Sequence, residues 1–193
     1  MKTIDIIKSP FYKWEFDLLE CDQILDKIQR LNFIKNYENF VTENDREVNF
    51  IIDRINLCLK DLKNTLYPNQ KTFEIVVTEC WANKTLFCQK HHKHHHPNSL
   101  FSGILYLTSH PDTGPTRFYY NDIFKYHQFI PYSSLQKDEL FFDFYPVKGT
   151  MIVFPSNILH SVLPVKEKST RYTIAFNTFF KGKIGGTSFT LEL

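Results

Sequence analysis

The feature that most constrains the fold is a series of short segments of β-type composition that fills the chain from about residue 72 onward. Each segment is rich in β-branched and aromatic residues, and clusters of Gly, Pro, Asn, Asp and Ser separate it from the next. The segments are 72–78, 100–107, 116–120, 140–146, 149–155, 160–165, 171–180 and 187–193. This pattern predicts a mainly β fold, a sandwich or barrel-like double sheet of the jelly-roll type.

The N-terminal part has a different texture, since all six glycines of the chain lie at or beyond Gly103. Two of its segments carry apolar residues at helical spacing. They are Phe16, Leu19, Ile24, Ile28, Leu31 and Ile34 in the first segment, and Val48, Ile51, Ile55, Leu59 and Leu62 in the second. Pro68 ends the second segment. We therefore expect a single domain over residues 1–193, in which 1–70 form a helical N-terminal support and 71–193 the β core.

Composition excludes several classes of protein. The formal net charge is +2, with 23 basic and 21 acidic residues, which is too balanced for a nucleic-acid-binding protein. No apolar run approaches the roughly 18 residues that a membrane span needs, and the N-terminus does not read as a signal peptide. The four cysteines form no CxxC pair, which favours free thiols in a reducing compartment. The expected protein is soluble and cytoplasmic, with no membrane or nucleic-acid partner.

Histidines are the first candidate functional residues, because five of the eight lie between positions 91 and 96. Such a run could be an exposed loop that chelates metal by accident. However, His94 and His96 are one residue apart, so in a strand both rings project from the same face and can share a metal ion. His160, after a second buried-looking strand, is the expected third ligand. His95 should point to the opposite face, and we expect His91 and His92 to be exposed or outside the ligand set.

Arg171 is the second candidate, in a chain with only five arginines. It comes eleven residues after His160 and opens a strand, with Thr173 on the same face. An inward-facing guanidinium without a carboxylate partner would be costly, and its own strand offers no Asp or Glu. A dicarboxylate ligand fits this position, with one end at the metal and the other held by Arg171.

Taken in order, these residues and their neighbours resemble the 2-oxoglutarate- and Fe(II)-dependent oxygenases, and most closely a family of such oxygenases found in bacteria and phages. The resemblance covers residues 80–178. Its elements are Trp81-x-Asn83, His94-x-His96-Pro97, Ser102-Gly103-x-x-Tyr106-Leu107, Gly114-x-Thr116-x-Phe118, Gly149-x4-Phe154-Pro155-x4-His160 and Arg171-x-Thr173-x-x-Phe176-Asn177. It implies a double-stranded β-helix, a cupin-like barrel with the metal and cosubstrate inside one open end.

The resemblance also implies roles for single residues. His94 and His160 would bind Fe(II), and Arg171 would bind the distal carboxylate of 2-oxoglutarate. Thr173, Tyr106 and Asn83 would assist cosubstrate binding through hydrogen bonds. The implied reaction consumes O2 and 2-oxoglutarate, releases succinate and CO2, and hydroxylates a C–H bond of an unidentified small-molecule or peptide substrate.

One position departs from the broad superfamily, which usually has Asp or Glu where this chain has His96. Three neutral imidazoles leave Fe(II) its full charge of +2, which favours the dianionic cosubstrate but removes an anionic donor. Asp112 or Asp122 could supply a carboxylate instead, although His96 is the preferred ligand.

Two other functions stay open at this stage. A three-histidine metal dioxygenase of the cupin type would use Arg171 for a substrate carboxylate, and a non-catalytic jelly-roll module would hold a structural metal or none. A structural zinc site needs four ligands, whereas the sequence offers three convincing ones. The aromatic segment 121–139 could form a lid, and neither the substrate nor the oligomeric state can be read from the sequence.

Overall fold

The computed structural model describes residues 11–36, 38–43, 45–109, 113–119, 141–166, 168–186 and 189–193. They form two antiparallel sheets. The larger has the order β1 (Tyr12–Glu15), β9 (Thr150–Pro155), β6 (Phe101–Tyr106), β11 (Arg171–Gly186), β4 (Phe73–Thr85), β3 (Asn39–Thr42) and β2 (Phe33–Asn36), and β12 (Phe189–Glu192) pairs with β11. The smaller has the order β5 (His91–His94), β10 (His160–Val162), β7 (Thr116–Tyr119) and β8 (Phe141–Phe144). All eight predicted β segments contain a strand, and the two sheets form the double-stranded β-helix.

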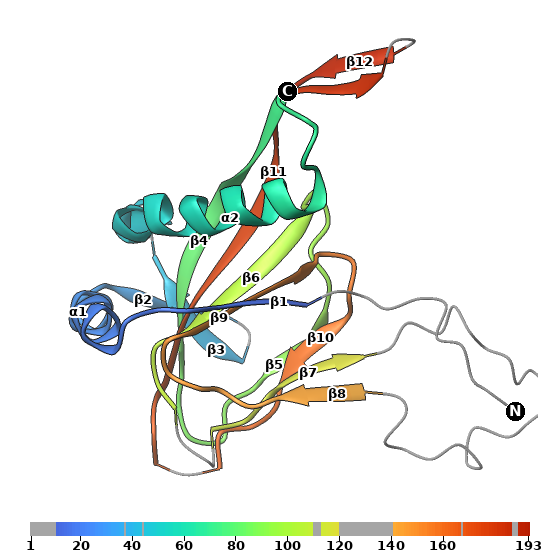
Figure 1. The fold of residues 1–193 in the computed structure, drawn as a ribbon. Coiled ribbons are helices and arrows are strands. Elements are labelled where there is room, and N and C mark those ends of the chain that lie inside the picture. Colours follow the sequence, from blue (N-terminus) through green and yellow to red (C-terminus); the bar gives the residue numbers. More distant parts are fainter. Residues whose placement is uncertain are drawn as a thin grey trace, which may run out of the picture.

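Two helices cover one face of the larger sheet, and the smaller sheet lies on the other side (Figure 1). Helix α1 (Leu18–Ile28) begins after Asp17, whose carboxylate accepts hydrogen bonds from the backbone N–H groups of the first turn. Helix α2 (Ile52–Leu66) follows a 3₁₀ helix, η1 (Asp45–Ile51), and buries Ile55, Leu59 and Leu62 against the sheet. Among the helices that the structure describes, none has the length and apolar character that crossing a membrane requires.

The N-terminal part is less helical than the sequence predicts. The first predicted helix extends to Ile34, but α1 ends at Ile28 and residues Phe33–Asn36 form β2, which pairs with β3. Residues Tyr12–Glu15 likewise pair with β9. Apolar residues at positions 31 and 34 are compatible with both a helix and a strand. Residues Phe33–Asn36 form a strand because they pair with the neighbouring strand β3. Through β3, this part of the chain reaches β4 and the cavity described below.

The central strands of the larger sheet are buried on both faces. One face packs against the helices, and the other forms a smaller core with the second sheet, made of Ile104, Tyr106, Phe118, Ile152, Phe154 and Ile158. Close packing explains one glycine of the sequence motif. A Cβ atom on Gly103 would lie 2.0 Å from the ring of Phe176 on the neighbouring strand β11, so only glycine fits there.

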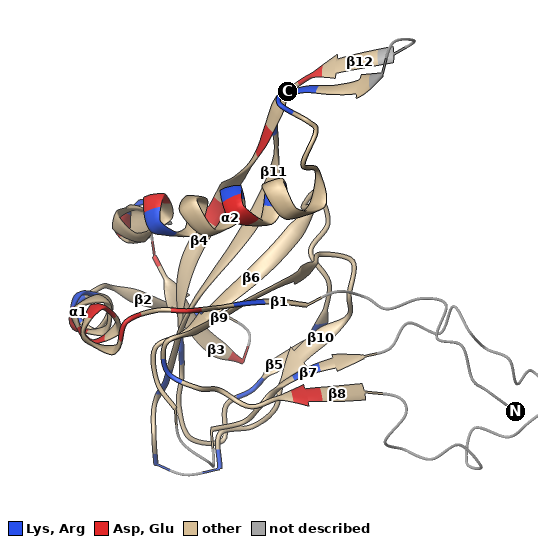
Figure 2. Cartoon of the chain, in the orientation of Figure 1, with Lys and Arg blue, Asp and Glu red and all other residues tan. Residues whose placement is uncertain are grey.

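Charged residues of both signs are mixed over the described chain, as Figure 2 shows most clearly along α2. The drawn residues form no continuous basic stripe. The paired ends of β11 and β12 extend away from the body of the molecule (Figure 1).

Candidate functional site

A cavity between the two sheets brings the three predicted metal ligands together. His94 and His160 are register partners on the neighbouring strands β5 and β10. His96 lies two residues beyond the end of β5, where its backbone N–H donates to the carbonyl of Ser156 over 3.0 Å. One ligand nitrogen from each ring lies within 4.8 Å of the others. The structure thus brings together the three residues that the sequence predicted as ligands, although His96 lies beyond the end of the strand.

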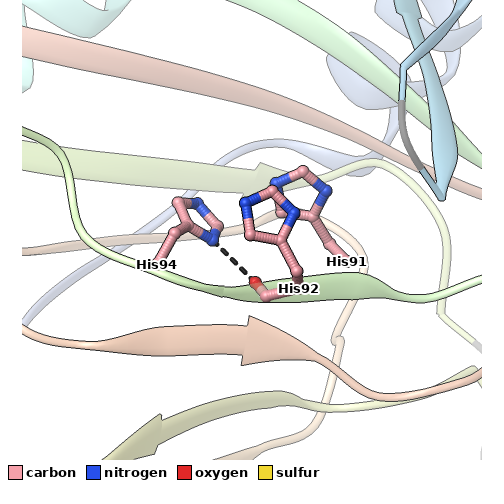
Figure 3. A group of neighbouring side chains, drawn as sticks. All are labelled: His91, His92 and His94. Atoms are coloured by element: carbon pink, nitrogen blue, oxygen red, sulfur yellow. Dashed lines mark hydrogen bonds between the residues drawn. The ribbon is translucent and has the colours of Figure 1, made fainter.

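Backbone carbonyls orient two of the three rings. The Nδ1 atom of His94 lies 2.8 Å from the carbonyl oxygen of His92, as Figure 3 shows, and Nδ1 of His160 lies 3.0 Å from the carbonyl oxygen of Ile158. A ring that donates from Nδ1 carries its lone pair on Nε2, so these contacts select the tautomer that can bind a metal.

The distance between Nε2 of His96 and Nε2 of His160 is 3.3 Å. Two nitrogens at about 2.1 Å from a shared ion are roughly 3.0–3.4 Å apart for octahedral to tetrahedral angles. The pair therefore has the spacing of two ligands on one ion.

Burial keeps the three imidazoles neutral. It lowers the pKa of His96 to about 4, lowers the pKa of His94, and lowers the pKa of His160 well below its ordinary value. Mutual repulsion among the rings acts in the same direction. Since a metal binds the neutral ring, this donor set suits a divalent ion at neutral pH.

Arg171 enters the same cavity from β11 of the larger sheet. The side chain is 2% exposed, and its Nη2 donates to Oγ1 of Thr116 over 3.1 Å. Its Nε is buried without a partner, and no carboxylate of the described residues pairs with the guanidinium. Burial lowers the pKa of Arg171 from its ordinary value, because the charge is removed from water. An anionic ligand in the cavity would offset that cost.

The residues expected to assist Arg171 take two different positions. Thr173 and Asn83 are register partners on β11 and β4, and both line the cavity. Tyr106 is fully buried behind Arg171, where its hydroxyl lies 2.8 Å from Oγ1 of Thr116 and its ring centroid 5.4 Å from the guanidinium carbon. Thr116 therefore links the tyrosine and the arginine.

Two lining residues were not expected from the sequence. His91 was expected outside the ligand set, exposed or behind it, but it lines the cavity, and burial lowers its pKa to about 3. Asn39 reaches the cavity from β3 in the N-terminal part, with its Nδ2 3.5 Å from Oδ1 of Asn83. Nothing in the sequence indicated that Asn39 would reach the cavity, because strand β3 was not predicted.

The remaining sequence-based assignments have different outcomes. His92 and His95 are exposed, but a ligand nitrogen of His92 lies within 4.8 Å of those of His91 and His94, so these three histidines form a second group that could hold a metal ion. Asp112, Asp122 and the aromatic segment 121–139 lie outside the described residues.

Solved structures with the same fold come from several organisms. An oxidoreductase of the 2OG-Fe(II) oxygenase family from Burkholderia pseudomallei has 17% identity and a TM-score of 0.64, covering 87% of this chain and 83% of that one. A prolyl-4-hydroxylase from Pseudomonas putida has 14% identity and a TM-score of 0.60, covering 88% and 92%. HygX from Streptomyces hygroscopicus, with nickel, 2-oxoglutarate and hygromycin B bound, has 12% identity and a TM-score of 0.63, covering 88% and 82%.

Sequence comparison identifies the family. No curated protein sequence matches the chain significantly. The family model described as "Putative 2OG-Fe(II) oxygenase" matches residues 79–177, which is just over half of the chain and includes the three histidines, Arg171 and Thr173. The chain therefore belongs to this 2OG-Fe(II) oxygenase family and is an oxidoreductase that uses Fe(II) and 2-oxoglutarate.

Proposed function

We propose that this protein is a dioxygenase that hydroxylates a C–H bond of a small-molecule or peptide substrate and releases succinate and CO2 from 2-oxoglutarate. His94, His96 and His160 hold Fe(II), and Arg171 binds the distal carboxylate of the cosubstrate. The observation that carries the proposal is the pairing of a buried guanidinium, whose Nε has no partner, with three neutral imidazoles in one cavity.

The iron supplies the oxygen activation that protein side chains cannot perform. The chain holds and orients the reactants. The carbonyls of His92 and Ile158 fix the rings of His94 and His160, which would leave Nε2 of each ring free to hold Fe(II). Arg171 offers a planar fork of donors that matches a carboxylate, and Thr116 fixes the direction of that fork. Thr173 and Asn83 add hydrogen-bonding groups along the cavity wall.

Apolar side chains enclose the reacting region. Phe154 lines the cavity, and its ring packs 5.0 Å from His160 and 4.8 Å from Phe118, centroid to centroid. Ile104 and Val162 complete this wall. These groups limit access of water to the metal, which strengthens every electrostatic contact inside the cavity.

The substrate is expected in a wider groove next to the metal site. Trp81 and His96 line both the cavity and the groove, and strands β4 and β11 run from one to the other. Glu79, Asn98, Asn177 and Phe179 line the groove but not the cavity. A molecule bound there would reach the metal past His96, while 2-oxoglutarate occupies the inner end beside Arg171.

The test is succinate formation from 2-oxoglutarate with Fe(II) and O2, in the wild type and in Arg171→Ala. Removing one partner of a buried charge pair costs about 3–5 kcal/mol, so the variant should lose roughly 100-fold or more of kcat/KM for 2-oxoglutarate. Arg54→Ala is the matched control, because Arg54 lies on α2 with its side chain 45% exposed. Equal turnover in the wild type and Arg171→Ala would contradict the assignment of Arg171.

A second measurement tests the use of 2-oxoglutarate independently of turnover. Titrating the ferrous protein anaerobically with 2-oxoglutarate should produce a visible metal-to-ligand charge-transfer band. A protein that binds Fe(II) but develops no band would fit a three-histidine dioxygenase of the cupin type instead.

A further inference from the structure

A β-bulge in β5 brings an additional histidine into the cavity. His94 pairs with His160 and His91 pairs with Val162, so three residues span the interval on β5 that two residues span on β10. In a regular strand, residues three apart point to opposite faces. The extra residue breaks that alternation, and the rings of His91, His92 and His94 all rise from the same side of β5 (Figure 3). The ring centroids of His91 and His94 are 4.5 Å apart.

The register of the smaller sheet places His91 in the same cross-strand row as Thr116, which contacts Arg171. One row across strands β7, β10 and β5 consists of Phe118, His160 and His94, and the next row consists of Thr116, Val162 and His91. Thr116 is the residue that accepts a hydrogen bond from Arg171. The first row therefore carries two metal ligands, and the second carries His91 and the partner of Arg171.

Two buried nitrogen atoms in this cavity have no hydrogen-bond partner among the described residues. They are Nδ1 of His91 and Nε of Arg171. Nε of Arg171 is always a donor, and Nδ1 of His91 is a donor in the tautomer that carries its proton there. A buried donor without a partner is unfavourable, so in that tautomer the ligand of the cavity is expected to supply acceptors for both. A carboxylate has two oxygens and about four lone-pair sites, which is enough to accept from an imidazole N–H and a guanidinium together.

We propose that His91 is a second binding residue for 2-oxoglutarate, donating from Nδ1 to the carboxylate that Arg171 also binds. This inference rests on the proposed function, and it assigns His91 to the cosubstrate instead of the metal. The bulge makes this contact possible, because a regular β5 would point His91 away from the cavity.

The experiment compares His91→Leu, His91→Gln and the control His95→Leu. His95 lies one residue beyond the end of β5, is exposed and does not line the cavity. Ni²⁺ replaces iron so that no turnover occurs, and calorimetry gives the Kd of Ni²⁺ and then the Kd of 2-oxoglutarate for the loaded protein. A hydrogen bond to a charged group corresponds to roughly a 10- to 100-fold change in affinity.

In His91→Leu we expect the Kd of 2-oxoglutarate to rise by about that factor and the Kd of Ni²⁺ to stay within about threefold. His91→Gln retains an N–H donor and should recover part of the affinity, which separates loss of a contact from misfolding. His95→Leu should match the wild type in both constants.

Two results would overturn the inference and leave the proposed function standing. They are an unchanged Kd for 2-oxoglutarate in His91→Leu, and a loss of Ni²⁺ affinity of the same size as the loss of 2-oxoglutarate affinity. A wild-type protein that binds Ni²⁺ but not 2-oxoglutarate would overturn the proposed function itself, and the role of His91 with it.

Discussion

At the scale of single residues, His96 distinguishes this site from the usual pair of histidines with one carboxylate. Its Nε2 lies 3.3 Å from Nε2 of His160, and a backbone hydrogen bond to Ser156 fixes the start of the loop that carries it. A third imidazole leaves the ion its full charge of +2. The dianionic cosubstrate would offset the charge of the ion, and the positive charge of Arg171 would then remain, because His96 stands where a carboxylate would neutralise it.

Removing His96 should therefore remove a ligand. We expect His96→Ala to weaken Ni²⁺ or Fe(II) binding by more than roughly 100-fold, since loss of even an outer-shell contact costs about 10- to 100-fold. His95→Ala is the matched control, because His95 is the adjacent histidine and is exposed. Metal titration of the two purified variants checks this. Equal affinities would mean that the third ligand comes from elsewhere.

Burial of the histidines also predicts how the metal-free protein responds to acid. The pKa of His96 is lowered to about 4 and that of His160 lies well below its ordinary value, whereas an unfolded histidine titrates near 6.5. Below about pH 6.5 the unfolded chain therefore binds more protons than the folded chain, and stability falls as the pH falls toward 4.

Urea unfolding of the metal-free protein at pH 7.5, 6.0 and 5.0 measures this effect. We expect the free energy of unfolding to decrease over this range, above the region where most carboxylates titrate. His96→Gln should show a shallower decrease, and His95→Gln should follow the wild type. A free energy that stays constant from pH 7.5 to 5.0 would contradict neutral burial of these rings.

The same residues show what the sequence could and could not predict. Strand alternation selected His94 and His96, the need for a ligand from a distant strand selected His160, and the cost of an unpaired charge selected Arg171. His91 was missed because the alternation rule assumes a regular strand, and the bulge in β5 exists only through its pairing with β10. The bulge changes the face of one histidine, which no spacing within residues 91–96 reveals.

At the scale of secondary-structure elements, the segments with a clear helical or β pattern were predictable, and three short strands of the N-terminal part were not. All eight β segments after residue 72 contain a strand, and the helical pattern from Val48 to Leu62 covers η1 and α2. Strands β1, β2 and β3 have four residues each and too little pattern of their own. Their pairing with distant strands stabilises them, which is a tertiary effect.

The amphipathic character of α2 leads to a prediction at this scale. Leu59 is fully buried against the larger sheet, whereas Leu57, two residues earlier on the same helix, is 60% exposed. Leu59→Ala should lower the free energy of unfolding by about 2–5 kcal/mol, because it leaves a cavity in the core. Leu57→Ala should change it by less than about 0.5 kcal/mol. Urea unfolding of both variants checks the packing, and similar losses would contradict it.

At the scale of the whole molecule, the two sheets contribute different parts of the site. The smaller sheet and the loop that follows β5 supply the three histidines, and β11 of the larger sheet supplies Arg171 and Thr173. Thr116 joins the two sheets through its contacts with Arg171 and Tyr106. A molecule held by the metal at one end and by Arg171 at the other therefore crosses from one sheet to the other.

This arrangement predicts that the metal stabilises the fold first and that the cosubstrate adds to this stability only once the metal is bound. Ni²⁺ alone should raise the Tm, and 2-oxoglutarate should raise it further only when the metal is bound, because two of its oxygens need the ion. A ligand present at 100 times its Kd adds about 2.7 kcal/mol of stability, which is a measurable shift for a chain of this size. Thermal unfolding with neither ligand, each ligand and both ligands gives the four values required.

Arg171→Ala separates the two increments. The variant should keep the shift caused by Ni²⁺, since its histidines are intact, and should lose the additional shift caused by 2-oxoglutarate. Arg54→Ala, on the helical face of the larger sheet, should keep both. If 2-oxoglutarate stabilised the metal-free protein as strongly as the Ni²⁺-loaded protein, the cosubstrate would bind without the ion, and the two sheets would not be joined in the way proposed.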